Sequence, residues 1–346
     1  MVSGTITGRG WAVPAAMPQD RLWDGFFAEH YGHSRIAKRV WQRSGIQTRH
    51  GVADPREEDV SAWSTAARMR RFVAEALPLG KEALTSCLAD AKLQPSDVGQ
   101  LTVVSCTGYA TPGLDVLLAR DLGLPASAQR LHVGHMGCYA ALPALATAAD
   151  AAVARGRTTL LLCLELTSLH IQPADQDVEQ MVAHALFSDA AAAVAVAPAG
   201  PGLELVDLVS RTDAPQAGLM SWDVTDLGFR MGLSPRVPTV LSGHVVEVVG
   251  GLLAAHGLAV DDVAHWAIHP GGPRIVDVVA SRLGLGDDQV TDSRAVLREH
   301  GNCSSATVLL ILDRVLARAD LHRGDHVVAM AFGPGLTLYA ALLRMR

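Results

Sequence analysis

The chain has 346 residues, of which 49% are hydrophobic, which is enough for one large globular unit or two fused halves with extensive buried cores. Its formal charge of −6 comes from 29 basic and 35 acidic residues spread along the chain, with no basic run to follow a phosphate backbone. We therefore expect no nucleic-acid partner.

The N-terminal segment MVSGTITGRGWAVPAAMPQD has no charged start followed by an apolar signal core. We find no uninterrupted apolar stretch of the roughly 18 residues that a bilayer span needs. These features predict a cytoplasmic protein with no membrane partner. The five cysteines are an odd number without CxxC spacing, which argues against a disulfide framework and a structural zinc site. We expect reduced thiols and no metal.

Short apolar runs rich in β-branched residues and leucine predict strands. They are LTVVS (101–105), TTLLLCL (158–164), AHWAI (264–268) and HVVAMAF (326–332). Helical stretches rich in alanine and leucine separate these runs. Alternating strands and helices are typical of an α/β protein.

The chain carries a faint internal repeat. The segments that start at Leu101 and Ala264 share one order: a strand, a helix that ends in Leu-Gly-Leu, a glycine turn that opens a helix, and another strand. We interpret them as two fused α/β halves, residues 1–212 and 213–346. Chance similarity in a chain rich in alanine and leucine is the alternative.

Cys138 follows the glycine turn GHMG and opens the helical stretch CYAALPALATAADAAVARG. Unpaired backbone N–H groups at a helix start favour a thiolate, which is the nucleophilic form of cysteine. A nearby imidazolium would lower the thiol pKa further, into a range of roughly 3.5 to 7.5. A buried, inert cysteine is the alternative, and Cys87, Cys163 and Cys303 fit that description.

Two polar residues of the second half lie where the repeat predicts a site: Asn302 is in the glycine turn that matches the Cys138 turn, and His269 is just past a strand end. His269 follows a predicted strand and precedes a Gly-Gly pair that lets a ligand approach the backbone. Asn302 lies in the glycine turn HGNCSS, where its amide could bind a carbonyl oxygen or cap the following helix. Ligands of α/β folds gather beyond the carboxyl ends of strands, so the repeat would bring both residues to Cys138.

A cysteine, a histidine and an asparagine suit thioester chemistry without a metal. The cysteine would attack an acyl-CoA, while the other two hold the carbonyl oxygen of a malonyl thioester as it loses carbon dioxide and becomes an enolate. A papain-like protease uses the same three residue types, but its cysteine lies in a different surrounding motif near the mature N-terminus.

Five motifs resemble segments of the type III polyketide synthases, the chalcone synthase-like family, in their bacterial form. They occur in the family's order and the match covers most of the chain: GHMGCYAAL, ELTSLHIQPADQDVEQMVAHALFSDAAAAV, WAIHPGGPRIVDVVASRLGL, HGNCSSATVLLILD and AFGPGLTLYAALL. The resemblance implies a homodimer of thiolase-fold subunits, each with two α/β halves in a layered αβαβα sandwich. It implies acyl-CoA and malonyl-CoA as substrates, no cofactor and no acyl carrier protein.

The resemblance also assigns site residues. It matches Cys138 to the nucleophile, and His269 and Asn302 to the other two catalytic residues. Further residues match the cavity wall, the loop that scaffolds the site, and the CoA-binding region. The cavity set is Cys106, Thr111, Thr167, His170, Phe187, Phe229, Gly333 and Pro334, and the CoA set is Arg39, Arg43, Gly271 and Gly272.

Several of these assignments have structural alternatives. Phe187 and Phe229 are expected to act as gatekeepers, although both could be plain core aromatics. Thr111 is expected to reach across the dimer to the partner's cavity. Arg39 and Arg43 suit CoA phosphates by charge and geometry, although they could form an ordinary solvated helix face.

The chain departs from the plant pattern. Cys106 and His170 replace cavity threonines, Ser188 replaces a glycine, and Pro143 lies early in the nucleophile helix, where a proline can kink the chain. The aromatic content of only 5% favours an aliphatic acyl or malonyl starter over a phenylpropanoid one. From such a starter we expect a pyrone, resorcinol or naphthol-type product.

The residues alone suggest three other functions to compare. A ketoacyl synthase III-like enzyme shares the cysteine, histidine and asparagine but performs one condensation on a carrier protein. The HMG-CoA synthase group needs a glutamate base, and no glutamate here lies in a motif that supports that role. A non-catalytic thiolase-fold subunit that binds an acyl ligand or a partner enzyme is the third.

Overall fold

The computed structural model describes residues 4–346. Nine strands form its framework: β1 (Thr5–Ala12), β4 (Val98–Ser105), β5 (Gln129–Gly134), β6 (Thr158–Glu165), β7 (Ala190–Ala197), β8 (Leu203–Thr212), β11 (Val263–Ile268), β12 (His326–Gly333) and β13 (Thr337–Met345). They are hydrogen-bonded in the order β11-β12-β13-β8-β1-β7-β6-β4-β5. Because β8 and β1 pair only at Thr5↔Glu204 and Ile6↔Leu203, this contact is a seam between two sheets.

Helices cover and separate the two sheets. They are α1 (Gln19–Leu22), α2 (Ala28–His30), α3 (Arg35–Gln42), α4 (Thr65–Asp90), α5 (Leu114–Leu122), α6 (Ala141–Arg155), α7 (Val178–Leu186), α8 (Val237–Ala255), α9 (Pro273–Leu283), α10 (Thr291–His300) and α11 (Ala306–Leu316). Two small sheets complete the fold, one of β2 (Ala16–Pro18) with β3 (Thr48–His50), the other of β9 (Met220–Thr225) with β10 (Gly228–Leu233).

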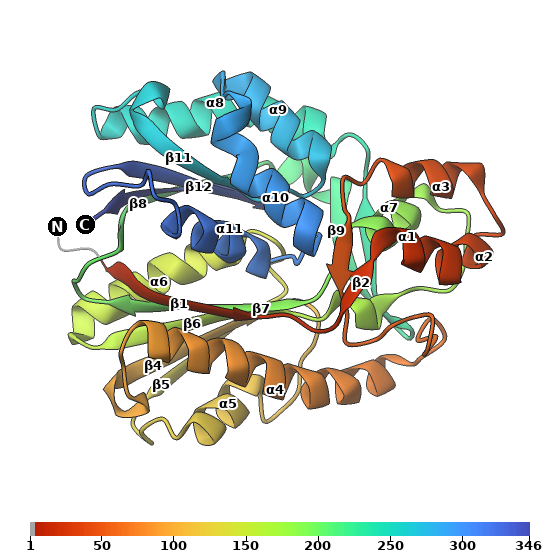
Figure 1. The fold of residues 1–346 in the computed structure, drawn as a ribbon, viewed down its shortest axis with the longest axis horizontal. Coiled ribbons are helices and arrows are strands. Elements are labelled where there is room, and N and C mark those ends of the chain that lie inside the picture. The colour runs from red at the N-terminus through yellow and green to blue at the C-terminus, as the bar shows by residue number, and fades with distance from the viewer. Residues whose placement is uncertain (1–3) are drawn as a thin grey trace.

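The elements stack in five layers, as Figure 1 shows. Helices α6 and α11 lie between the sheets, α4 and α5 cover the outer face of the first sheet, and α8 and α9 cover the outer face of the second. The predicted α/β class and the αβαβα layering are confirmed. All four predicted strands are present, within β4, β6, β11 and β12.

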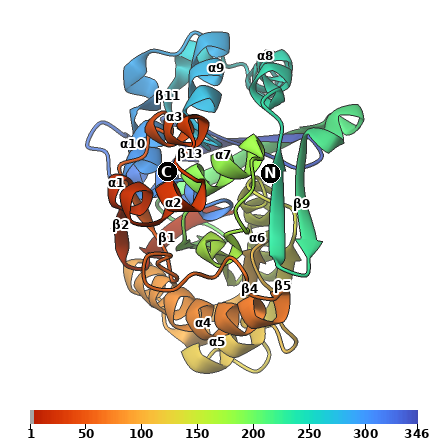
Figure 2. The same cartoon turned by 90° about the vertical axis from the view of Figure 1, so that its right-hand side faces the viewer.

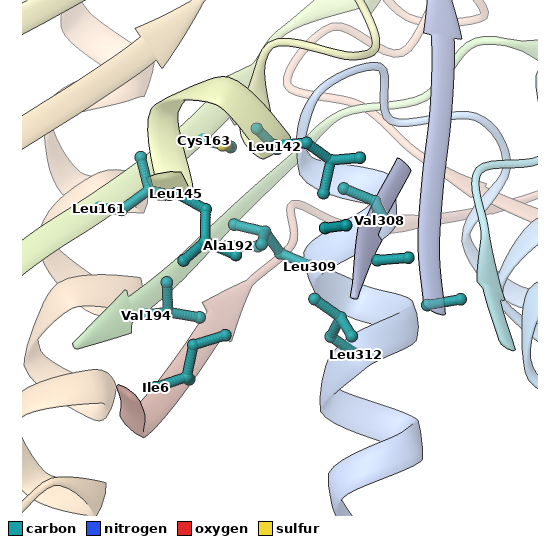
Figure 3. Packing of buried hydrophobic residues seen from close by; sticks show 14 of the residues in the cluster. Ile6, Leu142, Leu145, Leu161, Cys163, Ala192, Val194, Val308, Leu309 and Leu312 are labelled. Carbon is teal, nitrogen blue, oxygen red and sulfur yellow. The ribbon is translucent and has the colours of Figure 1, made fainter. Parts of the chain in front are cut away.

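The central core is built from small and branched side chains. Leu142 and Leu145 of α6 face Leu309 and Leu312 of α11, with residues of both sheets around them (Figure 3). All four leucines are at most 3% exposed. This apolar packing fixes α6 and α11 against each other, and it therefore also fixes the turns that precede them.

The internal repeat is visible in the topology. The elements α4, β4, α5, α6, β6 and β7 have counterparts in the same order in α8, β11, α9, α11, β12 and β13, with parallel β4/β6 matching β11/β12 and antiparallel β6/β7 matching β12/β13. The elements β5 and α7 of the first half and α10 of the second lie between these elements and are outside the match. Even the helix ends correspond, because α5 and α9 both end at a left-handed glycine, Gly123 and Gly284. The predicted boundary after Thr212 leaves β8 in the first half, whereas β8 pairs with β13 from Leu203 to Thr212.

Helix α8 is long and apolar. Within the described residues it alone meets the length and composition of a membrane-crossing helix, with 19 residues and a mean hydropathy of 1.5. It carries His244 and Glu247, and its buried face packs on β8, β13 and α9. This packing is that of a covering helix of a layered protein, and composition alone is weak evidence for a membrane span.

Candidate active site

Two glycines let the Cys138 turn and the loop after β12 pack closely, one against a proline and the other against a tyrosine. Gly137 has φ +82°, and a Cβ there would lie 2.6 Å from Cδ of Pro334. A Cβ on Gly333 would lie 2.6 Å from the ring of Tyr139. The loop of Gly333 and Pro334 therefore packs directly on the cysteine turn and fixes its path.

Pro143 does not kink the nucleophile helix. It lies in the first turn of α6, which begins at Ala141 and continues to Arg155. The first backbone N–H groups of a helix have no partner within that helix, so a proline there removes no helical hydrogen bond. The kink that the sequence suggested is absent.

Asn302 is fixed on both sides of its backbone. Its N–H donates to the carbonyl of Leu186 at 2.9 Å, and its carbonyl accepts from the N–H of Ser188 at 2.9 Å. These bonds form a short parallel bridge with Phe187. The side-chain oxygen accepts from the N–H of Ser304 at 2.9 Å, whereas the amide nitrogen has no partner among residues 4–346. The turn hydrogen-bonds the oxygen of the Asn302 side chain and leaves the amide nitrogen able to donate to a ligand.

His269 is a buried imidazole without a partner. It follows β11, is 1% exposed, and neither ring nitrogen has a hydrogen bond within the described chain. Its backbone N–H donates to the carbonyl of Met330 at 2.8 Å, which anchors the residue to β12. Buried polar groups are normally paired, so an unpaired imidazole that lines a cavity indicates a ligand position.

One cavity of about 630 Å³ brings Cys138, His269 and Asn302 together. Most of the side chains that line this cavity are apolar, and Phe187 and Met220 are among them. The three residues come from the β5–α6 turn, the end of β11 and the turn before α11, which the repeat predicted to meet. Of the other predicted residues, the same cavity is lined by Arg39, Arg43, Gly271 and Gly272.

Both titratable partners of this site are neutral in the free protein. Burial raises the pKa of the Cys138 thiol to about 12 and lowers the pKa of His269 to about 3. The expected thiolate, lowered in pKa by an imidazolium, is therefore absent. Instead, the Cys138 thiol donates to Oγ of Ser304 at 3.6 Å.

The sequence offered no reason to single out Glu165, which lies at the end of β6 behind this thiol. The Glu165 carboxyl is fully buried, and it accepts from the N–H of Cys106 at 3.0 Å, the hydroxyl of Thr107 at 2.8 Å and the hydroxyl of Ser305 at 2.5 Å. Burial raises its pKa. The Cys106 sulfur lies 3.4 Å from both Glu165 and Oγ of Ser304, so a hydrogen-bonded chain connects Glu165 to Cys138. Glu165 is the last residue of β6, and its position at a strand end does not by itself distinguish it from other strand ends in the sequence.

A small chamber of about 20 Å³ lies on the inner side of Cys138. Cys106, Thr167, Phe187 and Pro334 line it, as their assignment to the cavity requires. Trp222 on β9 and Met231 on β10 also line it, and neither was predicted. These two residues are cross-strand partners in the β9–β10 hairpin.

Phe229 does not lie in the cavity wall, to which the resemblance assigned it. It is fully buried and lines neither the large cavity nor the inner chamber. Its ring stacks on His170 at 4.6 Å, and the two line a separate void of about 40 Å³. Met231, two residues further along β10, lines both the large cavity and the inner chamber, as Phe187 and Met220 also do.

His170 carries a neutral imidazole that has a structural role. Its Nε2 lies 2.6 Å from the Thr107 carbonyl and its Nδ1 accepts from the N–H of Phe229 at 3.0 Å. Burial lowers its pKa to about 3. This residue holds β10 to the loop after β4 and does not contact the inner chamber.

The mouth of the large cavity is basic. Arg35, Arg39 and Arg43 are spaced four residues apart along α3 and its end, are exposed, and line the cavity together with Arg274 of α9. No ion pair holds any of the four in the described structure. Thr111 is exposed in the loop after β4 and lines none of the three cavities of its own chain.

Two pseudo-repeated α/β halves with a cysteine, a histidine and an asparagine at one cavity define a thiolase-fold condensing enzyme. Family models for the chalcone and stilbene synthases match the chain, the N-terminal domain over residues 4–201 and the C-terminal domain over residues 207–345. The chain belongs to the chalcone and stilbene synthase family. It is a type III polyketide synthase, an acyltransferase that condenses malonyl-CoA units, and enzymes of this type act on CoA thioesters without a cofactor.

Similar proteins cover nearly the whole chain. The 3,5-dihydroxyphenylacetyl-CoA synthase of Streptomyces toyocaensis is 32% identical over 98% of this chain and 89% of its own length. The 1,3,6,8-tetrahydroxynaphthalene synthase of Streptomyces peucetius subsp. caesius is 33% identical over 98% and 94%. The crystal structure of 1,3,6,8-tetrahydroxynaphthalene synthase from Streptomyces coelicolor A3(2) matches with a TM-score of 0.93 and 27% identity over 99% of both chains. The ketoacyl synthase III-like and non-catalytic alternatives are set aside by this membership.

Proposed function

We propose that Cys138 carries the growing acyl chain while His269 and Asn302 hold the thioester oxygen of malonyl-CoA. The observation that supports this most directly is the pair of unsatisfied groups that line the cavity of Cys138. They are the imidazole of His269, whose two ring nitrogens are buried without a partner, and the amide nitrogen of Asn302, which makes no hydrogen bond among residues 4–346. Two N–H donors at one carbonyl oxygen stabilise the negative charge of an enolate.

The steps balance without a metal. The Cys138 sulfur attacks the starter thioester, a ring nitrogen of His269 accepts the thiol proton, and CoA leaves as the thiol with that proton. The bond to the malonyl carboxylate then breaks, carbon dioxide leaves, and the electron pair forms an enolate held by His269 and Asn302. The enolate carbon attacks the carbonyl of the Cys138 thioester, a carbon–carbon bond forms, the carbon–sulfur bond to Cys138 breaks, and the sulfur leaves as a thiolate. The lengthened chain is then on CoA, and it returns to Cys138 when that thiolate attacks its thioester and CoA leaves.

The basic mouth is suited to the CoA phosphates. Arg39 and Arg43 line the cavity that leads to Cys138, and no carboxylate of the described chain forms an ion pair with either of them. Gly271 and Gly272 line the same cavity, where the lack of side chains lets a pantetheine arm pass close to the backbone. Guanidinium groups bind phosphate oxygens in pairs and remain charged at all relevant pH values.

The starter is an aliphatic acyl-CoA or malonyl-CoA, and the product is a pyrone, resorcinol or naphthol-type ring. The apolar lining of the large cavity supports an aliphatic chain. The names of the relatives point the same way, because they include an alpha-pyrone synthesis polyketide synthase-like protein from Mycobacterium tuberculosis and the tetrahydroxynaphthalene synthases.

A cytoplasmic homodimer is the proposed form. The edge strand β5 supports the dimer, because Leu131 is 36% exposed and the strand's outer backbone groups have no neighbouring strand in the described chain. Exposed edge strands of natural proteins are normally covered or paired. Thr111 is exposed in the loop after the neighbouring strand β4, from which it could reach a partner's cavity.

Comparison of Cys138→Ala with Asn302→Ala tests the proposal. Wild-type protein incubated with an acyl-CoA should gain the acyl mass on the Cys138 peptide and form product with malonyl-CoA. Cys138→Ala should remain folded but lose both. Asn302→Ala should keep loading and lose malonyl-CoA decarboxylation by ~100-fold, the usual effect of removing one oxyanion donor.

Normal turnover by folded Cys138→Ala, or equal loss of loading and decarboxylation in Asn302→Ala, would contradict these roles. Cys87→Ala is the matched control, because Cys87 is buried in α4 against the opposite face of the first sheet. Its loading and turnover per folded molecule should equal those of the wild type.

A further inference from the structure

The backbone of Asn302 is held by a segment that is itself attached to β3. Asn302 pairs with residues 186–188 through the two backbone hydrogen bonds of its parallel bridge. Within that segment, the hydroxyl of Ser188 accepts from the N–H of His50 at 2.8 Å and donates to the carbonyl of His50 at 3.2 Å. The position of Asn302 therefore depends on the last residue of β3, although β3 lies far away in the sequence.

The end of α10 leads directly into Asn302 and leaves no free space beside it. His300 is the last residue of α10, and Gly301 follows it with φ +74°. A Cβ on Gly301 would lie 2.9 Å from the Cβ of Ser188. Because the two segments touch at this glycine, a displacement of the end of α10 must also displace the turn that carries Asn302.

Two histidine side chains join β3 to the end of α10. Nε2 of His50 lies 3.2 Å from Nδ1 of His300, and the two rings stack with their centroids 5.2 Å apart. Trp11 of β1 meets the other side of this pair, edge-on to His300 at 5.6 Å. The contact spans 250 positions in the sequence and links the two halves of the fold directly behind Asn302.

The partners of the two rings fix where their protons lie. Nδ1 of His50 is 3.0 Å from the carbonyl oxygen of Pro14, which can only accept, so this nitrogen carries the proton. Nε2 of a neutral His50 is then an acceptor, and His300 donates to it from Nδ1. Burial lowers the pKa of His50, and burial together with the neighbouring His50 lowers the pKa of His300 to about 4. Both rings are therefore neutral at pH 7, and this hydrogen bond is intact.

We propose that His50 and His300 are a positioning pair, whose hydrogen bond holds the end of α10 against β3 and keeps the Asn302 amide directed at the malonyl thioester oxygen. This inference rests on the proposed role of Asn302 in decarboxylation. Neither histidine lines the large cavity or the inner chamber, so neither contacts the substrate there. Loss of the pair should therefore weaken the step that needs Asn302 and spare acyl loading on Cys138.

The test compares variants of His300 that keep or lose the donor at the Nδ1 position. His300→Asn places an amide nitrogen where Nδ1 lies, whereas His300→Phe keeps a ring that can stack but has no donor. The rate of malonyl-CoA decarboxylation is divided by the rate of acyl loading on the Cys138 peptide. We expect this ratio to fall ~10-fold for His300→Phe and to stay within ~2-fold of the wild type for His300→Asn, since a misplacement of 1 Å costs about 100-fold.

A double-mutant cycle shows whether the effect acts through Asn302. Asn302→Ala removes the amide that the pair positions, so the addition of His300→Phe should cause no further loss of decarboxylation. A further ~10-fold loss in the double variant would show that the histidines act on another group, and it would overturn the inference.

His256→Phe is the matched control. His256 follows the end of α8, where its Nε2 lies 2.9 Å from a carboxylate oxygen of Asp207, and it lines none of the three cavities. Its ratio of decarboxylation to loading should equal that of the wild type. His300→Gln carries the test if His300→Phe does not fold, because its amide extends past the Nδ1 position while the side chain stays polar.

The outcomes separate this inference from the proposed function. If Asn302→Ala loses decarboxylation but folded His300→Phe and His300→Gln keep the wild-type ratio, the inference alone is wrong. An equal fall of loading and decarboxylation in these variants overturns it as well, because it shows a general structural role. Unchanged decarboxylation in Asn302→Ala overturns the proposed role of Asn302 and the inference with it.

Discussion

The charges of this site appear only during the reaction. Burial holds Cys138 as a thiol and His269 as a neutral imidazole, because a charge in an apolar cavity loses the hydration that stabilises it in water. A neutral imidazole can donate one hydrogen bond and accept one proton, and both abilities are needed in the proposed steps. The resting site is thus an uncharged, pre-arranged set of groups that gains charge from its substrates.

Acid should destabilise the fold through histidines that must stay neutral. His170 and His184 each accept a backbone N–H, from Phe229 and Gln172, so neither can be protonated without breaking that bond. Burial lowers the pKa of His170 to about 3, and burial also holds the pKa of His184 well below its usual value. In the unfolded chain both titrate near 6.5, so the unfolded state binds more protons as the pH falls below that value.

The free energy of unfolding should therefore fall below pH 6.5, by about 1.4 kcal/mol per pH unit for each histidine. Urea unfolding at pH 7, 6 and 5 measures this slope. His170→Gln should have a shallower slope by about one proton, whatever its stability at pH 7. A slope equal to that of the wild type would contradict a neutral His170.

At the level of elements, the sequence predicted the framework well because the framework follows from local patterns. The short apolar run TTLLLCL predicts a buried strand of an α/β protein, and β6 contains it. The paired glycine turns predicted the meeting of Cys138, His269 and Asn302. Trp222 and Met231 were missed because their placement depends on how the β9–β10 hairpin folds over Cys106, a contact across 116 residues that no local pattern encodes.

The hairpin also explains the error at Phe229. Side chains on a strand alternate between two faces, so Phe229 and Met231 should share a face of β10. What separates them is position along the strand: Met231 pairs with Trp222, whereas Phe229 lies next to the turn, against His170. A motif alone does not show which of two residues on one strand face lies nearer to Cys138, and only the pairing of β10 with β9 decides it.

The fit between α6 and the loop after β12 leads to a prediction at Gly137. Alanine there would keep the unfavourable φ of +82° and would place a methyl group 2.6 Å from Pro334. We expect acyl loading per folded molecule to fall by ~100-fold, because a shift of about 1 Å in a reacting group has such an effect. Mass spectrometry of the Cys138 peptide after a timed pulse of acyl-CoA measures it.

Gly156 provides the matched control for this prediction. It caps the other end of α6 at φ +64°, and no atom lies within 4 Å of the position its Cβ would take. Gly156→Ala should lose ~1–2 kcal/mol of stability from backbone strain and retain normal loading. Equal loading by the two variants would show that the contact with Pro334 does not position Cys138.

For the whole molecule, the layered design leaves two very different outer surfaces. The C-terminal half ends in α8, whose exposed side mixes small residues with Val246, Glu247 and Thr239. The N-terminal half ends in the bare strand β5, flanked by the exposed loop that carries Tyr109 and Thr111. An uncovered strand is the less stable arrangement in water, since its backbone groups and Leu131 have a partner only if a second chain provides one.

Leu131→Glu should therefore convert the enzyme from a dimer to a monomer. In a two-fold interface the same residue occurs on both sides, so one substitution introduces two carboxylates into the contact. Sedimentation velocity at micromolar protein should show the mass of two chains for the wild type and of one for the variant. Val246→Glu, on the exposed side of α8, which covers the outer face of the second sheet in Figure 1, should remain dimeric. Figure 2 shows β5 at the end of its sheet, next to β4 and α5 and away from α8. A Leu131→Glu protein that sediments as a dimer, or a Val246→Glu protein that sediments as a monomer, would place the interface elsewhere.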